Sequence, residues 1–512
     1  MIPHLTSRFR LYGLGCCLVL FASWTTPVSV SADVPIFKVK FDKSLRSSPF
    51  TGRVTVFCGS SNREPRCGPN WFHPEPFISK DVINWSPGKT LTIDATDGDT
   101  ITFPRNLDSI DWTNYKAQAV ARWNTWEREV GTGPGNAFSE AVKITSDNQS
   151  EVELTLNRTV PEPEWPDSRW SKLLRVHSKL LSNFHKKDVY LHATVVLPKS
   201  YYDQPQRRYP TIFTIPGFGG THRHGFRDRP VDENNAEGVE FFRVMLDPSC
   251  PLGHHVFADS ANNGPYGTAL VEELIPTFDQ EFRTIAEPTA RFLTGHSSGG
   301  WSSLWVQITH PDTFGGVWST APDPVDFRDF QQINLYKAGE NMYVDADGKR
   351  RPLGRQNGKV LVWYRDFAEM EDTLGPGGQL HSFEAVFSPK TADGSPALIW
   401  DRETGEVNSD VAEEWKKYDI RLYLERNWGR VKDKLAGKLH VFMGDEDTFY
   451  LEGATRLLQK SLKKLGSDAV VELHPGKDHG TLMSQELRQR IRREMTEQFL
   501  QHHTVESGSP QP

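Results

Sequence analysis

The residues best suited to chemistry form the segment Gly295-His-Ser-Ser-Gly299, a G-x-S-x-G motif. It follows the short apolar run 291–294 and precedes a helix-forming stretch. A serine on a tight turn between a strand and a helix presents its hydroxyl freely, and the glycines let the backbone pass close to it. We therefore expect Ser297 to be a nucleophile. A glycine- and serine-rich turn without chemistry is the alternative, and only the surrounding elements decide between the two.

Two further reactive side chains follow apolar, strand-like segments downstream of Ser297. A histidine held by a carboxylate can take the proton of a serine and return it to a leaving alcohol. We expect His479 to be this base and Asp447 the acid, because the G-x-x-D spacing carries that carboxylate beyond the end of its strand. Other carboxylates nearby remain alternatives for the acid: Asp445, Glu446 and Asp478.

Acyl transfer also needs two N–H donors that face the developing oxyanion. The turn itself supplies one, the backbone N–H of Ser298. Gly217-Phe-Gly-Gly220 follows an apolar segment and has the small residues that such a loop requires, so we expect the second donor to be Phe218 or Gly219. A plain glycine-rich turn is the alternative for this loop.

The pattern of the chain predicts an α/β architecture that brings these residues together. A parallel sheet places the carboxyl ends of its strands at one edge, where each candidate residue follows a strand. The order of serine, aspartate and histidine along the chain is that of α/β-hydrolases. The expected strands are 209–216, 291–294, 316–319, 438–443 and 469–473, with helices at 301–310 and after 451.

On these motifs the chain resembles the putative esterase family of α/β-hydrolases, which includes enterochelin esterases, feruloyl esterases, esterase D and the mycolyltransferase antigens. The segments that carry the resemblance are 189–201, 216–217, 272–283 and 295–300. The resemblance implies an acyl-serine mechanism through Ser297, Asp447 and His479, with no metal and no organic cofactor. The stretch 257–264 and the long segment 320–436 depart from the usual family pattern, so the substrate stays open.

The remaining chain divides into further predicted regions. Short strands separated by turns predict an immunoglobulin-like β-sandwich at 33–165, ending in an acidic, proline-rich linker. The catalytic domain is expected at 166–505, with 320–436 as a cap-like insertion that carries selectivity, and 506–512 as a disordered tail. Three aromatic residues of the first domain fit either a sugar-binding platform or packing at a domain interface, of which we favour packing: Trp71, Phe72 and Phe77.

The N-terminus indicates export. Basic residues precede an apolar run from Leu11 to Ala22, which is shorter than a membrane span, and we expect a signal peptide at 1–32 with cleavage after Ala32. The protein is then secreted or periplasmic, with no transmembrane span. In such a compartment Cys58 and Cys67 either form a disulfide or stay as free thiols.

Charge and histidine spacing exclude other classes of partner. The net charge of −7 and the isoelectric point near 6.2 argue against nucleic acid as a partner. The histidines His222, His224, His254 and His255 have no carboxylate or cysteine at a metal-ligand spacing, so we expect no metal site. Asp323 and Asp326 either face the pocket or cap local turns.

These observations favour an exported serine carboxylic-ester hydrolase. Export, the β-domain and the aromatic insertion suggest an acylated polysaccharide or its fragments as substrate, whereas a small ester is expected to need only the triad and the oxyanion hole. Two alternatives stay open. One is an acyltransferase with the same triad, and the other is a non-catalytic carbohydrate-binding protein on a hydrolase fold. The oligomeric state is not determined by the sequence.

Overall fold

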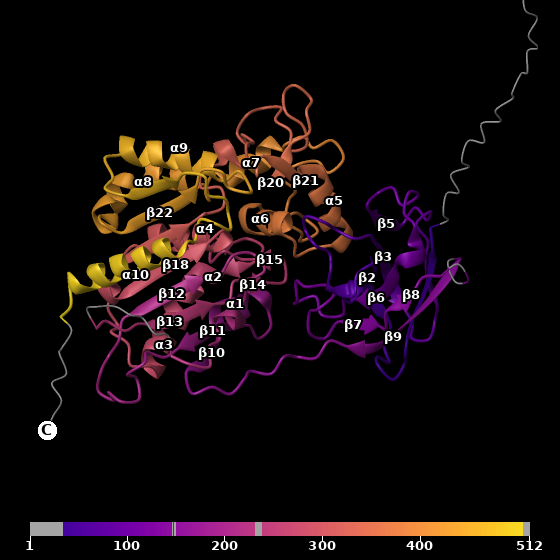
Figure 1. Cartoon of the computed structure of the whole chain (residues 1–512), viewed down its shortest axis with the longest axis horizontal. Coiled ribbons are helices and arrows are strands. Elements are labelled where there is room, and N and C mark those ends of the chain that lie inside the picture. Colours follow the sequence, from indigo (N-terminus) through magenta and orange to yellow (C-terminus); the bar gives the residue numbers. More distant parts are fainter. Residues whose placement is uncertain (1–33, 146, 148–149, 231–237, 505–512) are drawn as a thin grey trace, which may run out of the picture.

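The computed structural model describes residues 34–145, 147, 150–230 and 238–504, which form two lobes (Figure 1). Each lobe is built on its own large sheet. The N-terminal sheet ends at Thr159 and the C-terminal sheet begins at Ser171, with an extended linker between them. The expected signal peptide and the expected tail after residue 505 lie outside the described residues.

The N-terminal lobe consists mainly of strands. In its described part, nine strands share one hydrogen-bonded sheet in the order β4-β1-β9-β7-β6-β2-β3-β5, with β8 beside β6. The predicted immunoglobulin-like sandwich has two separate sheets. The single hydrogen-bonded sheet does not confirm this arrangement, and the immunoglobulin-like fold stays a prediction. The strands are β1 (Ile36–Phe41), β2 (Phe50–Gly59), β3 (Phe77–Trp85), β4 (Leu91–Ile93), β5 (Thr100–Phe103), β6 (Lys116–Ala121), β7 (Ala137–Ser139), β8 (Val142–Lys143) and β9 (Glu151–Thr159).

The C-terminal lobe has the predicted α/β architecture. Its described residues form an eight-stranded sheet in the order β10-β11-β13-β12-β18-β19-β22-β23. Within that sheet β11 runs opposite to all the other strands, which are parallel to one another. The strands are β10 (Ser171–His177), β11 (Tyr190–Val196), β12 (Thr211–Ile215), β13 (Phe242–Leu246), β18 (Arg291–His296), β19 (Gly316–Thr320), β22 (Leu439–Gly444) and β23 (Val470–His474).

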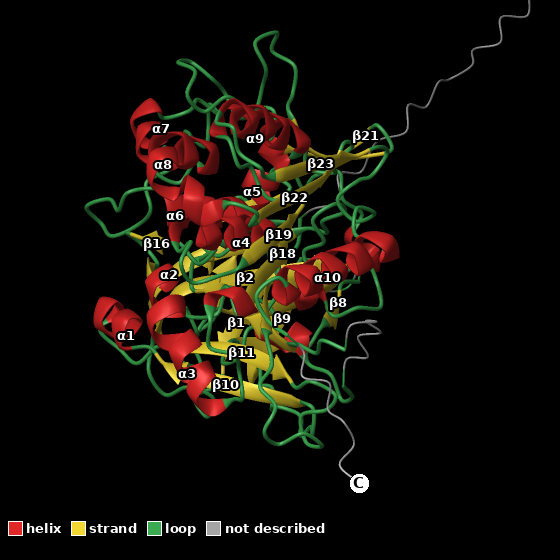
Figure 2. Cartoon of the chain, turned by 90° about the vertical axis from the view of Figure 1, so that its left-hand side faces the viewer, coloured by secondary structure: helices red, strands yellow, loops and turns green. Residues whose placement is uncertain are grey.

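Helices cover both faces of this sheet. Successive side chains of a strand point to opposite faces, and each central strand therefore contributes apolar residues to both. On one face Leu293, Val317 and Val441 pack beneath α3 (Ile275–Glu281), α4 (Ser298–Thr309), α8 (Ile420–Leu435) and α9 (Glu452–Lys464). On the other face Phe292, Trp318 and Phe442 pack beneath α10 (Gln485–Leu500). Figure 2 shows α4 and α10 on opposite sides of the central strands. The smaller helices α1 (Lys179–His185) and α2 (Tyr266–Ala269) lie near β10 and β11.

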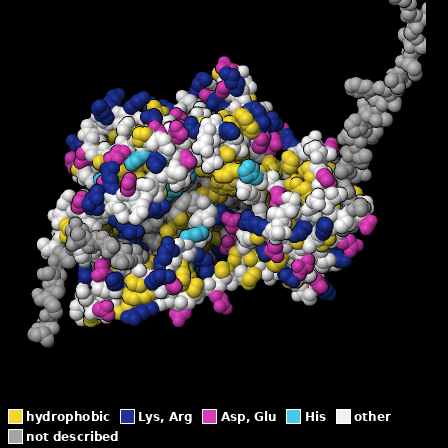
Figure 3. All heavy atoms as spheres, viewed as in Figure 1, with side chains coloured by type: hydrophobic (Ala, Val, Ile, Leu, Met, Phe, Trp, Pro, Cys, Tyr) yellow, Lys and Arg dark blue, Asp and Glu magenta, His cyan; other side chains and the backbone are white. Residues whose placement is uncertain are grey.

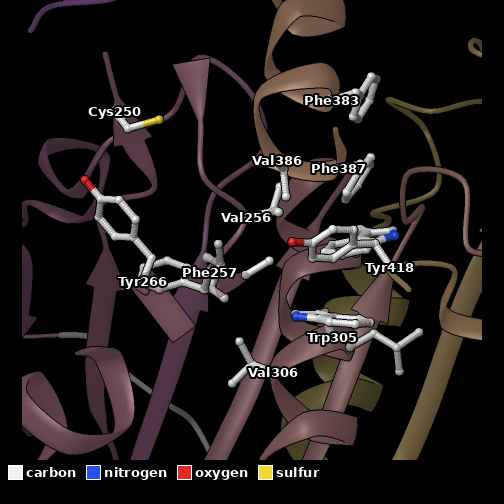
Figure 4. Close-up of a cluster of buried hydrophobic side chains, with 14 of the residues drawn as sticks. Cys250, Val256, Phe257, Tyr266, Trp305, Val306, Phe383, Val386, Phe387 and Tyr418 are labelled. Carbon is white, nitrogen blue, oxygen red and sulfur yellow. The ribbon is translucent and has the colours of Figure 1, made fainter. Parts of the chain in front are cut away.

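The long segment between β19 and β22 packs on top of α4. It contains β20 (Pro352–Gln356), β21 (Lys359–Trp363), α5 (Tyr364–Leu374), α6 (Gln379–Phe387) and α7 (Ser409–Trp415). Figure 4 shows Phe383, Val386 and Phe387 of α6 beside Trp305 and Tyr418 in one apolar cluster. Helix α8, which follows this segment, belongs to the helical layer of the sheet. The bounds 320–436 of the cap-like insertion stay a prediction.

The two lobes share a continuous apolar interface. Phe57, Phe77 and Phe103 of the N-terminal sheet belong to the same buried cluster as the core of the C-terminal lobe. Helix α5 of the insertion lies against β3 and β5. At the edge of this interface the guanidinium of Arg122 donates to the carbonyl oxygens of Pro376 at 2.5 Å and Pro251 at 3.4 Å. The N-terminal lobe therefore packs against both the sheet domain and its insertion.

The cysteines and the membrane-span prediction both relate to export. Cys58, Cys67 and Cys250 are all free thiols, so of the two alternatives for Cys58 and Cys67 the structure has the unbridged one. Across the described ranges, helices with the length and apolar character of a membrane span are absent.

Candidate active site

Ser297 lies on the sharp turn between β18 and α4. Its backbone adopts φ 60° and ψ −128°, a strained conformation for a residue with a Cβ and one that costs on the order of 1–3 kcal/mol. A Cβ on Gly295 would lie 2.0 Å from the carbonyl oxygen of Gly299, and a Cβ on Gly299 would lie 1.9 Å from that of Ile215. The two glycines of the motif are thus required for this turn, as the sequence predicts.

His479 and Asp447 form a hydrogen-bonded pair, with 2.7 Å between Nδ1 and Oδ2. Asp447 is fully buried, and its Oδ1 accepts the N–H of Phe449 at 2.8 Å. Burial alone would lower the pKa of His479, but the charge and hydrogen bond of Asp447 outweigh it and raise that pKa. A neutral imidazole that donates from Nδ1 leaves Nε2 as the basic nitrogen.

The other candidate acids are engaged elsewhere. Asp445 accepts the N–H of Gly476 at 2.7 Å, and Asp478 accepts the N–H of Thr481 at 2.8 Å. Glu446 is exposed to solvent. Among the four carboxylates that the sequence leaves open, Asp447 is the one hydrogen-bonded to His479.

The glycine-rich loop lies against the serine turn. A Cβ on Gly217 would lie 3.0 Å from the carbonyl oxygen of His296 and 3.2 Å from Cβ of Ser297. Phe218 lines the same pocket as Ser297, whereas Gly219 does not. This placement favours Phe218 over Gly219 as the donor that joins Ser298.

One pocket of ≈ 270 Å³ contains Ser297 and His479. Its other polar lining residues are His296, Asp323, Gln331 and Gln379. Its apolar lining residues come from both lobes and from the insertion: Trp71, Phe218, Leu353, Phe367, Leu380, Phe383, Phe449 and Leu451. The insertion therefore forms part of the wall over the serine, in the position of a cap.

A family model described as Putative esterase matches residues 188–480, more than half of the 512-residue chain. The chain belongs to this esterase family. It is an enzyme of the carboxylic-ester hydrolase class, and its C-terminal lobe is the α/β-hydrolase fold that the sequence predicts.

Solved structures similar to this esterase include three hydrolases. A ferulic acid esterase shares 14% identity with a TM-score of 0.40, over 64% of this chain and 99% of that one. S-formylglutathione hydrolase from Agrobacterium tumefaciens shares 14% identity with a TM-score of 0.39, over 64% and 95%. FphF, a fluorophosphonate-binding serine hydrolase of Staphylococcus aureus, shares 15% identity with a TM-score of 0.39, over 64% and 98%.

Asp323 is the acidic residue of the esterase pocket that sequence patterns leave undecided. It is 5% exposed, and it accepts the hydroxyl of Ser298 at 2.6 Å while the hydroxyl of Ser297 lies 3.5 Å away. Burial raises the pKa of Asp323 to about 6, although the Ser298 hydrogen bond opposes the shift. Asp326, by contrast, pairs with Arg421 at 3.1 Å and has a structural role. A signal for Asp323 was its place just beyond β19, at the edge where Ser297 and Asp447 also lie.

Two other histidines, His254 and His222, hold the segments on either side of the glycine-rich loop. His254 donates from Nε2 to the carbonyl oxygen of Pro216 at 3.0 Å and accepts the N–H of Val256, which fixes a neutral imidazole. Burial lowers its pKa to about 4. His222 bonds through Nδ1 to Asp247. In the described part of the esterase, clusters of three or more His, Cys, Asp or Glu suited to a metal do not occur.

The three aromatic residues singled out in the N-terminal domain pack at the lobe interface. Phe77 is fully buried and stacks with Phe103, with ring centroids 5.4 Å apart. Phe72 stacks on Phe449 at 6.1 Å, and Trp71 lines the pocket beside Phe218. Interface packing, the favoured alternative, is thus confirmed. The contribution of Trp71 to the pocket is the part that a sequence pattern did not reveal.

Proposed function

We propose that this esterase cleaves its substrate through an acyl intermediate on Ser297, with His479 as base and Asp447 as its partner. The observation that supports this most strongly is that one pocket contains the strained Ser297 and His479, whose imidazole is hydrogen-bonded to the fully buried Asp447. The remaining groups at the pocket have roles consistent with this chemistry.

The reaction follows from these positions. Ser297 Oγ attacks the ester carbonyl carbon while Nε2 of His479 takes the hydroxyl proton. The oxyanion forms beside the N–H groups of Ser298 and Phe218, at the N-terminal end of α4, where the helix dipole also favours negative charge. The intermediate collapses, His479 returns the proton to the leaving alcohol, and water then cleaves the acyl-serine by the same steps in reverse order.

The pocket supports an apolar, ring-sized group on the substrate. Dry cavities of about 150 Å³ bind benzene, so ≈ 270 Å³ has room for an aromatic ring with a short chain. We infer that an acyl or alcohol group of this size is recognised here, as part of an extracellular ester such as an acylated polysaccharide or its fragments. Asp323, Gln331 and Gln379 are placed to bind its polar substituents.

The nucleophile is tested with Ser297→Ala. We expect hydrolysis of p-nitrophenyl acetate to fall by about 10⁴- to 10⁶-fold, and labelling by a fluorophosphonate to disappear, at an unchanged melting temperature. Retained labelling or retained hydrolysis would contradict the assignment. Product analysis of the wild type with a polyol acceptor separates hydrolysis from acyl transfer.

The substrate class is tested with a panel that contains acetylated xylan, feruloylated arabinoxylan and simple p-nitrophenyl esters. We expect kcat/KM to be higher for feruloylated arabinoxylan than for acetylated xylan, because the aromatic ring of the feruloyl group fills the pocket. A preference for acetylated xylan would contradict this. Export is tested by mass spectrometry of the mature protein, which is expected to begin at Asp33.

A further inference from the structure

The wall of the nucleophile pocket includes a residue from the other lobe. Trp71, in the loop before β3, has its ring centroid 5.4 Å from that of Phe218. It also makes an edge contact with Phe367 of α5, at 5.1 Å and an interplanar angle of 90°. One tryptophan of the N-terminal lobe therefore contacts both the glycine-rich loop and the insertion, beside Ser297. Figure 3 shows the hollow where the two lobes meet.

Arg128, also from the N-terminal lobe, makes a second contact with the glycine-rich loop. Its guanidinium lies 4.8 Å from the centroid of the Phe218 ring, within the range of a cation–π interaction. A Cβ on Gly219 would lie 3.9 Å from its Nη2. The Arg128 side chain is 8% exposed and pairs with the more exposed Glu129 at 2.7 Å. A largely buried cation thus lies against the ring of Phe218 and close to Gly219.

The loop that carries Arg128 is itself held firmly. The guanidinium of Arg122 donates to the carbonyl oxygen of Glu127 at 2.8 Å and, across the interface, to that of Pro376 at 2.5 Å. Asn136 donates to the carbonyl oxygen of Val130 at 3.0 Å. Gly377 of the insertion also packs closely against this loop, since a Cβ on Gly377 would lie 3.1 Å from Cβ of Arg128.

The two loops of the N-terminal lobe are also tied to each other. Arg66, a few residues before Trp71, donates from Nη1 to the carbonyl oxygen of Gly131 at 2.8 Å. A Cβ on Gly131 would lie 1.7 Å from the carbonyl oxygen of Arg66, so the two backbones are in direct contact. Trp71 and Arg128 therefore belong to one fixed surface.

We propose that the N-terminal lobe completes the oxyanion hole, with Trp71 and Arg128 as positioning residues that hold Phe218. This inference rests on the proposed function of Ser297. Oxyanion donors accelerate a reaction only when they are held in place before charge develops, and the phenyl ring is the part of Phe218 that a neighbouring lobe can hold. The positive charge of Arg128 also favours the negative charge that develops nearby.

This role of the N-terminal lobe has a consequence for small esters. A small ester was expected to need only the triad and the oxyanion hole of the C-terminal lobe. If the other lobe positions Phe218, then every ester depends on it, including p-nitrophenyl acetate, which has no remote part to bind.

The test uses the full-length protein with Trp71→Ala, Trp71→Phe, Arg128→Gln and Arg128→Lys. Since deletion of a whole oxyanion donor costs about 10²- to 10³-fold in kcat, we expect Trp71→Ala and Arg128→Gln to lower kcat for p-nitrophenyl acetate by about 10- to 100-fold, with little change in KM. The inhibition constant of a trifluoromethyl ketone, whose serine adduct carries an oxyanion, rises by a similar factor. Trp71→Phe and Arg128→Lys recover most of the activity.

Arg105→Gln is the matched control. Arg105 belongs to the same lobe and pairs across the interface with Glu369 at 2.9 Å, but it does not line the pocket. We expect it to keep full kcat. Melting temperatures of all variants separate loss of positioning from unfolding, and the conservative variants serve as the test if Trp71→Ala does not fold.

Two failures are distinguishable. If a fluorophosphonate does not label Ser297 in the wild type, the proposed function is wrong. If it labels Ser297, and the folded Trp71 and Arg128 variants keep wild-type kcat or change only KM, the positioning role is overturned while the proposed function stands.

Discussion

Two histidine–aspartate pairs in the described part of the C-terminal lobe are joined through Nδ1 of the imidazole, and they use the same local chemistry in different surroundings. His479 bonds to Asp447 through Nδ1, and His222 bonds to Asp247 through Nδ1 as well. In both pairs the aspartate has a second partner, the N–H of Phe449 or the N–H of Ser249. The pairs differ in what surrounds the imidazole.

The His222 ring is enclosed by other aromatic rings. It stacks against Trp165 at 5.9 Å and against His192 at 5.4 Å, and the carbonyl oxygen of His222 accepts the hydroxyl of Thr194 at 2.7 Å. This pair ties the short 3₁₀ helix His222–Gly225, after the glycine-rich loop, to the end of β13. His479 instead lines the pocket of Ser297. A histidine bonded to an aspartate is thus a candidate base only where the imidazole also lines the pocket of a nucleophile.

The largest loss of activity is expected for Asp447→Asn. The amide cannot hold His479 in the required tautomer or stabilise its protonated form, so we expect kcat to fall by about 10⁴-fold. The measurement is kcat for p-nitrophenyl acetate beside Asp247→Asn. Equal losses for the two variants would show that the two pairs are not functionally distinct.

Asp247→Asn is expected to act mainly on stability. Burial alone would raise the pKa of Asp247, but hydrogen bonds from His222 and Ser249 outweigh it and hold that pKa at about 2. An aspartate in the unfolded chain has a pKa near 3.9. Because the pKa of Asp247 is lower in the folded protein, its carboxylate stabilises the fold by about 2–3 kcal/mol at pH values above the unfolded pKa, and this stabilisation is lost as the pH falls towards 2.

Urea unfolding of the wild type between pH 5 and 2 checks this expectation. The wild type should lose stability over this range more steeply than Asp247→Asn, which has no carboxyl at this position to protonate. Parallel slopes for the two proteins would contradict it. At neutral pH the variant should keep at least about a tenth of wild-type kcat, because the pair acts on the loop and not on the substrate.

Asp323→Asn is expected to change the pH dependence of kcat/KM. The negative charge of Asp323 adds to that of Asp447 in raising the pKa of His479. Removal of that charge destabilises the protonated imidazole, so the pKa of His479 falls and the base stays neutral to lower pH. We expect the acidic limb of the kcat/KM profile to move to lower pH. A limb that moves to higher pH, or does not move, would contradict this effect of the Asp323 charge on the pKa of His479.

Asp445→Asn is expected to have the smallest effect. Its carboxylate accepts the N–H of Gly476 in the loop before His479, and an amide oxygen can accept the same bond. We expect kcat to stay within about twofold of the wild type. A loss as large as that of Asp447→Asn would move the acid role to Asp445.

The sequence was informative wherever function requires a local backbone. Ser297 and its glycines could be recognised because the turn admits few residue types, and His479 and Asp447 because each follows a recognisable strand. Asp323 was harder, because a carboxylate after a strand can equally cap a turn, as Asp326 does. Trp71 and Arg128 could not be assigned, since they reach the site only through packing between lobes, and single-sequence patterns carry no information about such distant contacts.

The shared apolar interface also determines how the molecule comes apart. Since Phe57, Phe77 and Phe103 lie in the same buried cluster as the core of the C-terminal lobe, the covalent link through residues 160–170 adds little to the cohesion of the two halves. A protease cut in this segment should leave two fragments that co-elute and keep esterase activity. On heating, the halves should melt in one cooperative transition rather than in two.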